Sequence, residues 1–220
     1  MNADLGVAIM AGGEGRRLVG HVPKALAPFA GGTLLDHQLR RVAILEPART
    51  VVLAHHNAEA IVDHLRREPV DVLVEPEPLG TAGGLCLLPP APATWLVINV
   101  DHVSDVDLAA FVGKSMPPCT AMVWEARIPV DEGVVDVQGG RIVAWRERPV
   151  LRLPVTIGLY VFDRAALDRV LNGTRRDMPD LVSAFIPEGV RTRLHPGTWF
   201  DAGTPERLLA AEQWWTGRSR

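Results

Sequence analysis

Apolar runs of strand length alternate with segments of helical periodicity along the first hundred residues. Residues 7–10 form a short, wholly apolar run, which is typical of a strand buried on both faces. Between residues 33 and 45, leucine, valine and alanine recur at helical spacing, with Asp36, Arg40 and Arg41 on the opposite side. This repetition of strand and helix predicts a doubly wound, mostly parallel sheet. We predict further strands at 50–56, 70–76 and 94–101, a helix at 58–67 and a glycine-rich helix start at 80–87.

The second half of the chain has a different pattern, in which strand signals dominate. Residues 120–127 predict a strand and residues 134–148 a β-hairpin, because Gly139 and Gly140 suit a two-residue turn. No shift in composition divides the chain, so residues 1–220 are expected to form a single domain. We also predict strands at 156–163 and 190–196 and helices at 164–171, 180–186 and 205–215.

The composition is that of an ordinary globular protein and argues against several classes of function. Of the 220 residues 47% are hydrophobic, and a net charge of -3 leaves no basic excess to neutralise a nucleic-acid backbone. No run reaches the ~18 apolar residues of a membrane span. Cys86 and Cys119 lack metal-ligand spacing, which indicates buried thiols in a reducing compartment. We therefore expect a cytoplasmic protein with no nucleic-acid partner and no membrane contact.

The segment after the first apolar run carries the strongest chemical signal. Gly12, Gly13 and Gly15 follow the run directly, and glycines in this position let backbone N–H groups approach a phosphate. Arg17 and Lys24 then supply positive charge that glycine cannot. The pattern predicts a binding site for a nucleoside triphosphate.

Six blocks of sequence, in order, resemble the motifs of the sugar-1-phosphate nucleotidyltransferases. The first joins AGGEGRRL to PKALAPFAGGTLLDH, and the second is EPEPLGTAGGL at residues 75–85. The resemblance implies a Rossmann-like (GT-A-like) α/β fold, with a mostly parallel mixed sheet and helices on both faces. The remaining blocks are NVD at 99–101, the segments at 133–149 and 157–163, and WFDAGTPERLLAAEQ at 199–213.

Within this family the chain resembles the small single-domain members. Examples are the D-glycero-D-manno-heptose-1-phosphate guanylyltransferases and the N-acetylmuramate-1-phosphate uridylyltransferases. The second block also resembles the corresponding loop of the mannose-1-phosphate guanylyltransferases. Such a protein is expected to be a monomer or a homodimer.

The resemblance implies a reaction in which a sugar-1-phosphate oxygen attacks the α-phosphorus of a nucleoside triphosphate and pyrophosphate leaves. The protein must then position two anions and neutralise charge in the transition state. Mg²⁺ is the implied cofactor, held by Asp101 and Asp201 at two predicted strand ends, because it prefers oxygen ligands. Residues 1–115 are expected mainly to bind the nucleotide, and residues 116–220 mainly the sugar phosphate.

Roles for individual residues follow from their positions in the family motifs. The residues implied in catalysis are Arg17, Lys24 and Asp101. Those implied in nucleotide binding are Ala11, Gly12, Gly13, Gly15, Arg17, Glu75, Gly80, Thr81 and Asp101. Those implied in sugar-phosphate binding are Asn99, Gly133, Glu147, Arg148 and Gly158.

Three positions depart from the family pattern. Arg148 stands where the family has a lysine, which keeps the charge but offers a planar fork to a phosphate. The segment between Arg17 and Lys24 is shorter than the family norm, so the loop over the triphosphate must be anchored differently. Val100 replaces a glycine before the metal-binding acid, which reduces backbone freedom close to the sugar.

The nucleotide base is predicted from Glu75, which the resemblance places at the base edge. A carboxylate only accepts hydrogen bonds, and guanine offers two adjacent donors to it. We therefore favour GTP, with UTP as the alternative, and a heptose- or mannose-type sugar phosphate.

Two other classes of function compete with this prediction. A regulatory paralogue that binds an NDP-sugar without turnover would not need Arg17, Lys24, Asp101 and Asp201 together. A GT-A glycosyltransferase would be expected to carry an Asp-x-Asp pair at the end of the fourth strand, and Val103 occupies the place of the second acid.

Overall fold

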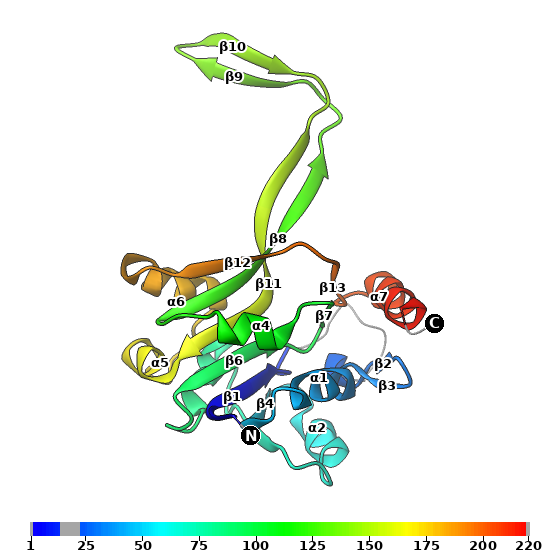
Figure 1. The fold of residues 1–220 in the computed structure, drawn as a ribbon, viewed down its shortest axis with the longest axis vertical. Helices are drawn as coiled ribbons and strands as arrows, with labels where there is room; N and C mark the ends of the chain where they lie inside the picture. Colours follow the sequence, from blue (N-terminus) through cyan, green and yellow to red (C-terminus); the bar gives the residue numbers. More distant parts are fainter. Residues whose placement is uncertain (1, 14–22, 219–220) are drawn as a thin grey trace.

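The computed structural model describes residues 2–13 and 23–218, which form a twisted sheet covered by helices on both faces (Figure 1). The neighbouring strands are parallel except at β11, so the predicted mostly parallel mixed sheet is confirmed. From edge to edge its seven strands are β12 (Arg191–His195), β8 (Cys119–Pro129), β11 (Val150–Asp163), β6 (Thr94–Asn99), β1 (Asn2–Met10), β4 (Pro47–Ala54) and β5 (Asp71–Val74).

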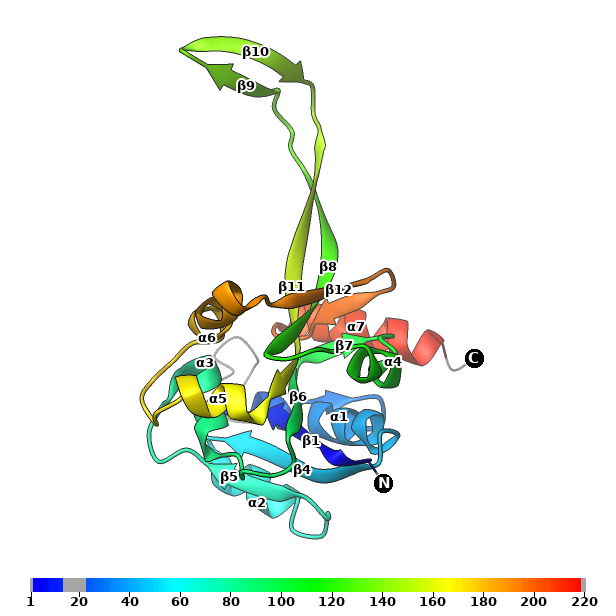
Figure 2. The same ribbon diagram turned by 60° about the vertical axis from the view of Figure 1, so that its left-hand side comes forward.

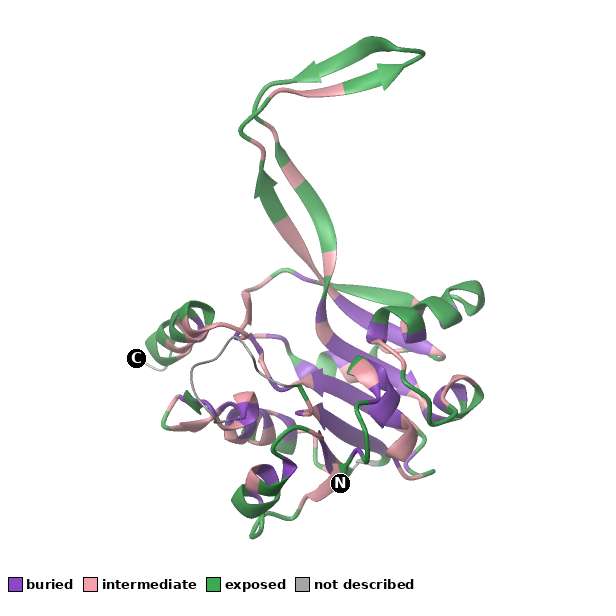
Figure 3. Cartoon of the chain, turned by 180° about the vertical axis from the view of Figure 1, so that it is seen from behind, coloured by how far each residue is buried: buried purple, intermediate pink, exposed green. Residues whose placement is uncertain are grey.

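The core consists of two apolar layers, one on each face of the sheet. In β1, Val7 and Ile9 point into one layer and Ala8 into the other, as the period of two in a strand requires. The central strands are accordingly buried over most of their length (Figure 3). One layer contains residues of α1 (Leu34–Ala43), α2 (Ala58–His64), α4 (Leu108–Gly113) and α7 (Pro205–Gly217). The other contains residues of α3 (Gly80–Gly83), η2 (Gly84–Leu87), α5 (Arg164–Val170) and α6 (Met178–Phe185).

Helix α1 illustrates how local sequence sets a boundary. Thr33 Oγ1 accepts a hydrogen bond from the Asp36 N–H at 3.1 Å, and the Asp36 carboxylate accepts one from the Thr33 N–H at 2.8 Å. This reciprocal capping satisfies two backbone donors that the helix itself leaves unpaired. Across the described residues, no helix is long and apolar enough to cross a bilayer.

Several short elements were not predicted because two or three residues carry no measurable periodicity. β7 (His102–Ser104) and β13 (Trp199–Asp201) pair antiparallel and connect two segments far apart in the chain. Helix α4 was likewise missed. The remaining short elements are β2 (Pro28–Phe29), β3 (Gly32–Thr33), η1 (Lys24–Leu26) and η3 (Ile186–Glu188).

β8 and β11 continue beyond the sheet as a two-stranded ribbon, which ends in the hairpin of β9 (Val134–Gln138) and β10 (Arg141–Arg146). Two views separated by 60° both show this hairpin projecting from the body (Figure 2). The predicted hairpin is confirmed, and its two turn glycines have φ angles of 56° and 77°. Residues 124–155, which comprise the ribbon and the hairpin, are called the arm.

Candidate active site

The principal candidate site is a cavity of about 600 Å³ at the carboxyl ends of four parallel strands. Met10 ends β1, Asn99 ends β6, and His55 and Glu75 directly follow β4 and β5, and all four line the cavity. In open α/β sheets this edge is where ligands bind, because loops from both faces meet there. A second cavity of about 310 Å³ adjoins it and shares Thr81, Asn99 and Asp101 with it.

Three predicted site residues converge beside this shared wall. The Lys24 ammonium group donates a hydrogen bond to the Asp101 carboxylate. A Cβ added to Gly203 would lie 2.8 Å from Asp201 Oδ1, 3.4 Å from Lys24 Nζ and 3.6 Å from Asp101 Oδ2. Lys24, Asp101 and Asp201 therefore surround one small volume that only a glycine at position 203 leaves open.

The pairing of β7 with β13 brings the two aspartates together. Asp201 lies opposite His102 in this pair, and the Ala202 N–H donates to the Asp101 carbonyl oxygen at 2.9 Å. Arg207, in the first turn of α7, forms an ion pair with Asp201 Oδ2 at 2.9 Å. The second carboxylate is thus fixed from its own strand and from the following helix.

The carboxylate pair fits the ligand preference of Mg²⁺, which is commonly held by one or two carboxylates together with substrate phosphates. Among the described residues no group of three or more His, Cys, Asp or Glu side chains could by itself enclose a metal ion. A cation bound by Asp101 and Asp201 would therefore depend on a substrate for its remaining ligands.

The glycine-rich segment is described only in part. Ala11 donates its N–H to the Leu53 carbonyl oxygen at 2.8 Å, which holds the end of β1 against β4. Gly12 and Gly13 line the larger cavity, and a Cβ on Gly12 would contact His55 at 3.4 Å. The predictions for Gly15 and Arg17 lie outside the described residues.

The second glycine-rich loop is anchored by a distant segment that sequence reasoning did not identify. The Thr81 N–H and hydroxyl donate to Asp177 Oδ1 at 2.9 and 3.3 Å, and the Met178 N–H donates to Thr81 Oγ1 at 2.8 Å. Gly80 has a φ of +83°, and a Cβ there would lie 2.7 Å from the Arg176 carbonyl oxygen. Gly80 and Thr81 thus line the cavity in a fixed position.

Glu75 lines the larger cavity, although its side chain is mostly buried. Its Oε2 accepts a hydrogen bond from the Leu79 N–H at 3.1 Å, and its Oε1 lies against Gly84, where a Cβ would come within 2.3 Å. Burial raises the pKa of the Glu75 carboxyl group, and the Leu79 N–H partly opposes this shift. The carboxylate keeps lone pairs for a further donor.

Asn99 and Gly158 lie against each other where β6 meets β11. Gly158 has a φ of +70°, and a Cβ there would lie 2.5 Å from Asn99 Nδ2. Both residues line the smaller cavity, as do Thr156, Tyr160 and Trp199, which sequence reasoning did not single out. Thr156, Tyr160 and Trp199 could not be identified from the sequence, because threonine, tyrosine and tryptophan are ordinary residue types in strands.

Gly133, Glu147 and Arg148 are in the arm and line neither cavity. Trp145 packs on Gly133, where a Cβ would approach its ring to 2.5 Å, and its Nε1–H donates to Glu147 Oε2 at 3.0 Å. In the structure Arg148 therefore does not lie beside Asp101 and Asp201 of its own chain. Extended strand pairing in the ribbon separates the two groups, and the binding roles of the three arm residues stay predictions.

A buried network behind Asp101 was also missed by sequence reasoning. Gln38 of α1 is fully buried and donates its amide N–H groups to the carbonyl oxygens of Val100 and His102. Its Oε1 accepts a hydrogen bond from Arg41 at 3.4 Å. These contacts hold the backbone on both sides of Asp101.

His102 continues this network on the far side of Asp101. Burial lowers its pKa to about 3, so the ring is neutral at ordinary pH. Nδ1 lies 2.6 Å from the carbonyl oxygen of Ile157 and must donate to it, which leaves Nε2 to accept from the Ser104 hydroxyl at 2.7 Å. His102 thus connects the Asp101 turn to the β11 segment before Gly158.

A cavity at the carboxyl ends of parallel strands, with carboxylates and a lysine on its wall, is a site class that α/β proteins use to bind nucleotides. The family model described as "Nucleotidyl transferase" matches residues 7–216. The chain belongs to this family of nucleotidyltransferase enzymes, which confirms the resemblance found in the sequence blocks.

Individual relatives show how far the similarity extends. The chain is 37% identical over 157 residues to the bifunctional protein GlmU of Cereibacter sphaeroides, covering 66% of this chain and 35% of that protein. It is 27% identical over 222 residues to the mannose-1-phosphate guanyltransferase beta-B of Xenopus laevis, covering 91% and 62%. It thus spans less than two thirds of the length of these relatives.

Solved structures show the same fold. HddC of Yersinia pseudotuberculosis superposes with a TM-score of 0.72 at 21% identity, covering 96% of this chain and 99% of that chain. The HddC structure is also known in complex with GMP-PN. At this identity the likeness establishes the nucleotidyltransferase fold alone.

Proposed function

We propose that the protein transfers a guanylyl group from GTP to a sugar-1-phosphate of the heptose or mannose type, releasing pyrophosphate. The observation that carries the proposal is the convergence of Lys24, Asp101 and Asp201 beside the wall shared by two cavities. Two adjoining cavities suit two substrates that must react with each other. A carboxylate pair beside a lysine suits the phosphates at which they react.

In this proposal the first half of a single domain binds the nucleotide and the second half mainly binds the sugar phosphate. The larger cavity takes GTP, and its wall comes entirely from residues before Gly113, apart from Arg175 and Asp177. The smaller cavity takes the sugar, with Asn99 from the first half and Gly158 from the second. Gly133, Glu147 and Arg148 would complete the sugar-phosphate site.

The chain's own groups would act mainly by positioning and charge. The N–H groups near Ala11, Gly12, Gly13 and Gly15 would cradle phosphates, and Arg17 would neutralise their charge. Lys24 would exchange its bond with Asp101 for a reacting phosphate oxygen. Mg²⁺ held by Asp101 and Asp201 would supply further charge neutralisation at the phosphates.

The choice of GTP rests on Glu75. Its carboxylate lies in the wall of the larger cavity and retains acceptor capacity, which suits the adjacent N1–H and N2–H donors of guanine. A mannose-1-phosphate guanyltransferase among the relatives, and the HddC structure with GMP-PN, support the same base. UTP is the competing nucleotide.

We also propose a cytoplasmic location. Nucleoside triphosphates are the substrates of the proposed reaction, and they are cytoplasmic metabolites. Cys86 and Cys119 are both free thiols, which fits a reducing compartment, although only Cys119 is buried as expected and Cys86 is partly exposed.

Pyrophosphate release tests the proposal directly. GTP, UTP, ATP, CTP and dTTP are each paired with mannose-, heptose-, glucose- and N-acetylglucosamine-1-phosphate in the presence of Mg²⁺. We expect the fastest release from GTP with a mannose- or heptose-type phosphate. Faster release from UTP would transfer the assignment to a uridylyltransferase.

Absence of turnover with every pair would contradict an enzymatic function. Binding of an NDP-sugar under those conditions would instead support the regulatory paralogue. Asp63→Asn is the matched control for variants of the acid pair, because Asp63 is exposed on α2 and its carboxylate forms an ion pair with Arg66, away from both cavities.

A further inference from the structure

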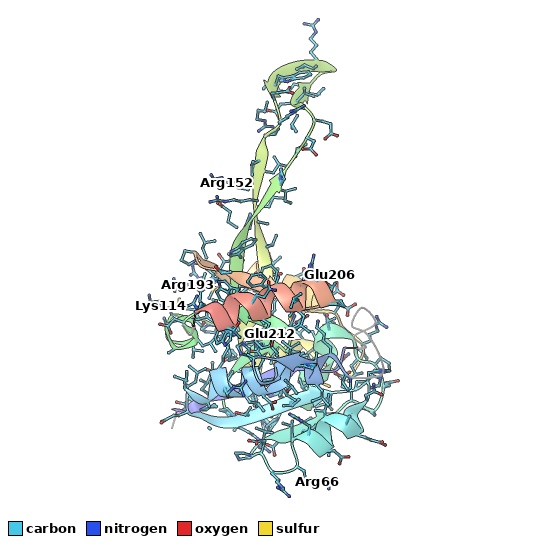
Figure 4. All side chains as sticks on the ribbon, turned by 90° about the vertical axis from the view of Figure 1, so that its right-hand side faces the viewer. Arg66, Lys114, Arg152, Arg193, Glu206 and Glu212 are labelled. Carbon is cyan, nitrogen blue, oxygen red and sulfur yellow. The ribbon has the colours of Figure 1, made fainter. Side chains whose placement is uncertain are left out.

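The arm joins the body by strand pairing and by Trp124 at its base, whose Nε1–H donates to the Gly197 carbonyl oxygen at 3.0 Å. Beyond this base the ribbon stands clear of the body (Figure 4). From Thr156↔Val123 to Val150↔Pro129 its ribbon is an uninterrupted antiparallel ladder, and the irregularity in register lies below it, between Thr156 and Tyr160. The ribbon therefore holds the hairpin out at a fixed distance. With a rise of about 3.3 Å per residue, Val150 lies about 20 Å beyond Thr156 at the cavity wall.

The arm exposes an unusual amount of apolar surface. Seven of the fourteen large apolar side chains that are exposed among the described residues belong to it, and Trp145 is 61% exposed. An isolated two-stranded hairpin is marginally stable in water, and large exposed apolar surfaces mark interaction sites. The seven residues are Ile128, Val137, Ile142, Val143, Trp145, Val150 and Leu153.

We propose that two copies of the chain exchange arms, so that each arm covers its apolar residues on the partner and places Glu147 and Arg148 at the partner's smaller cavity. The placement of Arg148 rests on the proposed function, whereas the docking of the arm does not. A second copy is the occupant because it can receive the arm without any bending of the extended ribbon. Folding the arm onto its own cavity would require such a bend.

The area of the arm fits this occupant. Seven half-exposed large side chains present on the order of 500 Å² of apolar surface, and a stable interface takes about 800 Å² per partner. In an exchanged dimer each copy buries its own arm and also the surface that the partner's arm covers. These two areas together exceed about 800 Å² per partner, whereas the area of a single arm is smaller than this value.

The charges at the receiving site agree with the exchange. The two cavities are lined by the carboxylates of Glu75, Asp101, Asp177 and Asp201 but, among the described residues, by only two cationic side chains, Lys24 and Arg175. An anionic sugar phosphate needs additional positive charge there. Arg148, 76% exposed on the arm, supplies it in the planar form that binds phosphate oxygens well.

Sedimentation velocity tests the docking without any substrate. We expect the wild-type chain to be a dimer at micromolar concentration and Ile142→Glu with Val143→Glu to raise its dissociation constant at least tenfold. Ile44→Glu is the matched control, because Ile44 is 80% exposed on the body, beyond the end of α1, and should leave the dimer unchanged. A monomeric wild type, or a dimer insensitive to the two arm substitutions, would overturn the proposal.

Cross-linking tests where the tip of the arm lies, again without activity. Copies with Arg148→Cys are mixed with copies with Thr156→Cys, both in a Cys86→Ser background, and treated with a bismaleimide of about 10 Å span. Exchange predicts a covalent dimer. Within one chain the ribbon alone separates Val150 from Thr156 by about 20 Å, so a doubly substituted chain that links internally would contradict exchange.

Mixing inactive variants tests the functional part. The Asp101→Asn chain has a defective cavity and an intact arm. The Arg148→Ala chain has an intact cavity and a defective arm. Random reassembly gives half heterodimers with one complete site in each, so the mixture should regain about a quarter of wild-type activity. No recovery, in a mixture that sedimentation shows to have reassembled, would refute the placement of Arg148. If the wild-type protein is inactive although the arms cross-link between copies, the proposed function is rejected and the proposed docking of the arms is retained.

Discussion

The cavity edge of the sheet and the arm position their residues in opposite ways. Around the cavity, Asp101 and Thr81 are held by contacts from segments far apart in the chain: Asp101 by Lys24 and Ala202, and Thr81 by Asp177. In the arm, Glu147 and Arg148 are held only by neighbours close in sequence or across the ribbon. The geometry of the body is therefore intrinsic to the chain, whereas the environment of the arm's tip depends on what it meets.

Among the substitutions that test this difference between the cavity edge and the arm, Asp101→Asn should have the largest effect on activity. Asp101→Asn keeps the size of the side chain but removes a charge from the pair that would hold Mg²⁺. We expect kcat to fall by about 10²–10³-fold, the range typical for loss of one electrostatic group at a reaction centre. Pyrophosphate release measures the effect, with Asp63→Asn as the control. Retention of full activity would exclude Asp101 from the site.

Gln38→Leu should produce an intermediate loss, although Gln38 touches neither cavity. The substitution leaves the carbonyl oxygens of Val100 and His102 without their donor, at a cost of about 1–3 kcal/mol in unfolding free energy for each buried group. If Gln38 positions Asp101, the concentration of Mg²⁺ at half-maximal rate should also rise. A stability loss with an unchanged Mg²⁺ dependence would reduce Gln38 to a structural residue.

Val42→Ala provides the comparison for that experiment. Val42 is a buried residue of the same helix that contributes to the apolar layer. It should lower stability by a similar amount without altering the response to Mg²⁺. Comparing the two variants separates positioning from folding.

Glu75→Gln should have a smaller and pH-dependent effect. Burial raises the folded-state pKa of Glu75 above its ordinary value of 4.5, so the folded state binds the proton more tightly than the unfolded state. The stability that this proton contributes is present below pH 4.5 and is lost as pH rises through the folded-state pKa. Urea unfolding at several pH values should show that this dependence disappears in the variant.

The same variant tests the base. An amide cannot present two acceptors to guanine, so the ratio of GTP to UTP use should fall. An unchanged ratio would remove Glu75 from base recognition. This outcome would be independent of the stability measurement.

The smallest effect should come from the arm. In the Ile142→Glu, Val143→Glu background the chain is expected to be monomeric, and a further substitution at an exposed arm position, Val137→Ala, should change the free energy of unfolding by less than about 0.5 kcal/mol, because exposed positions contribute little. Leu96→Ala, at a fully buried position of β6, should cost about 2–5 kcal/mol. Equal losses at the two positions would show that the arm is part of the cooperative fold and is not independent of the body.

Much of the fold and part of the site followed from the sequence. Buried strands such as residues 7–10 carry continuous apolar runs, and the Gly139–Gly140 pair requires a tight turn, so local patterns were sufficient for both. The contacts of Gln38 were not predictable, because a glutamine on a helix is usually exposed. The length of β11 was also underestimated, since its outer half contains Pro154, a residue type that is unfavourable inside a sheet.

The sequence by itself determined the two-layered α/β organisation, since periodicity records which face of each element is apolar. It also determined the residue types available for phosphate chemistry. Only the tertiary structure decided that Lys24, Asp101 and Asp201 converge at Gly203, and that Arg148 lies far from them. The reason is that local sequence fixes burial and turn geometry, whereas the distance between remote segments depends on how strands pair across the whole sheet.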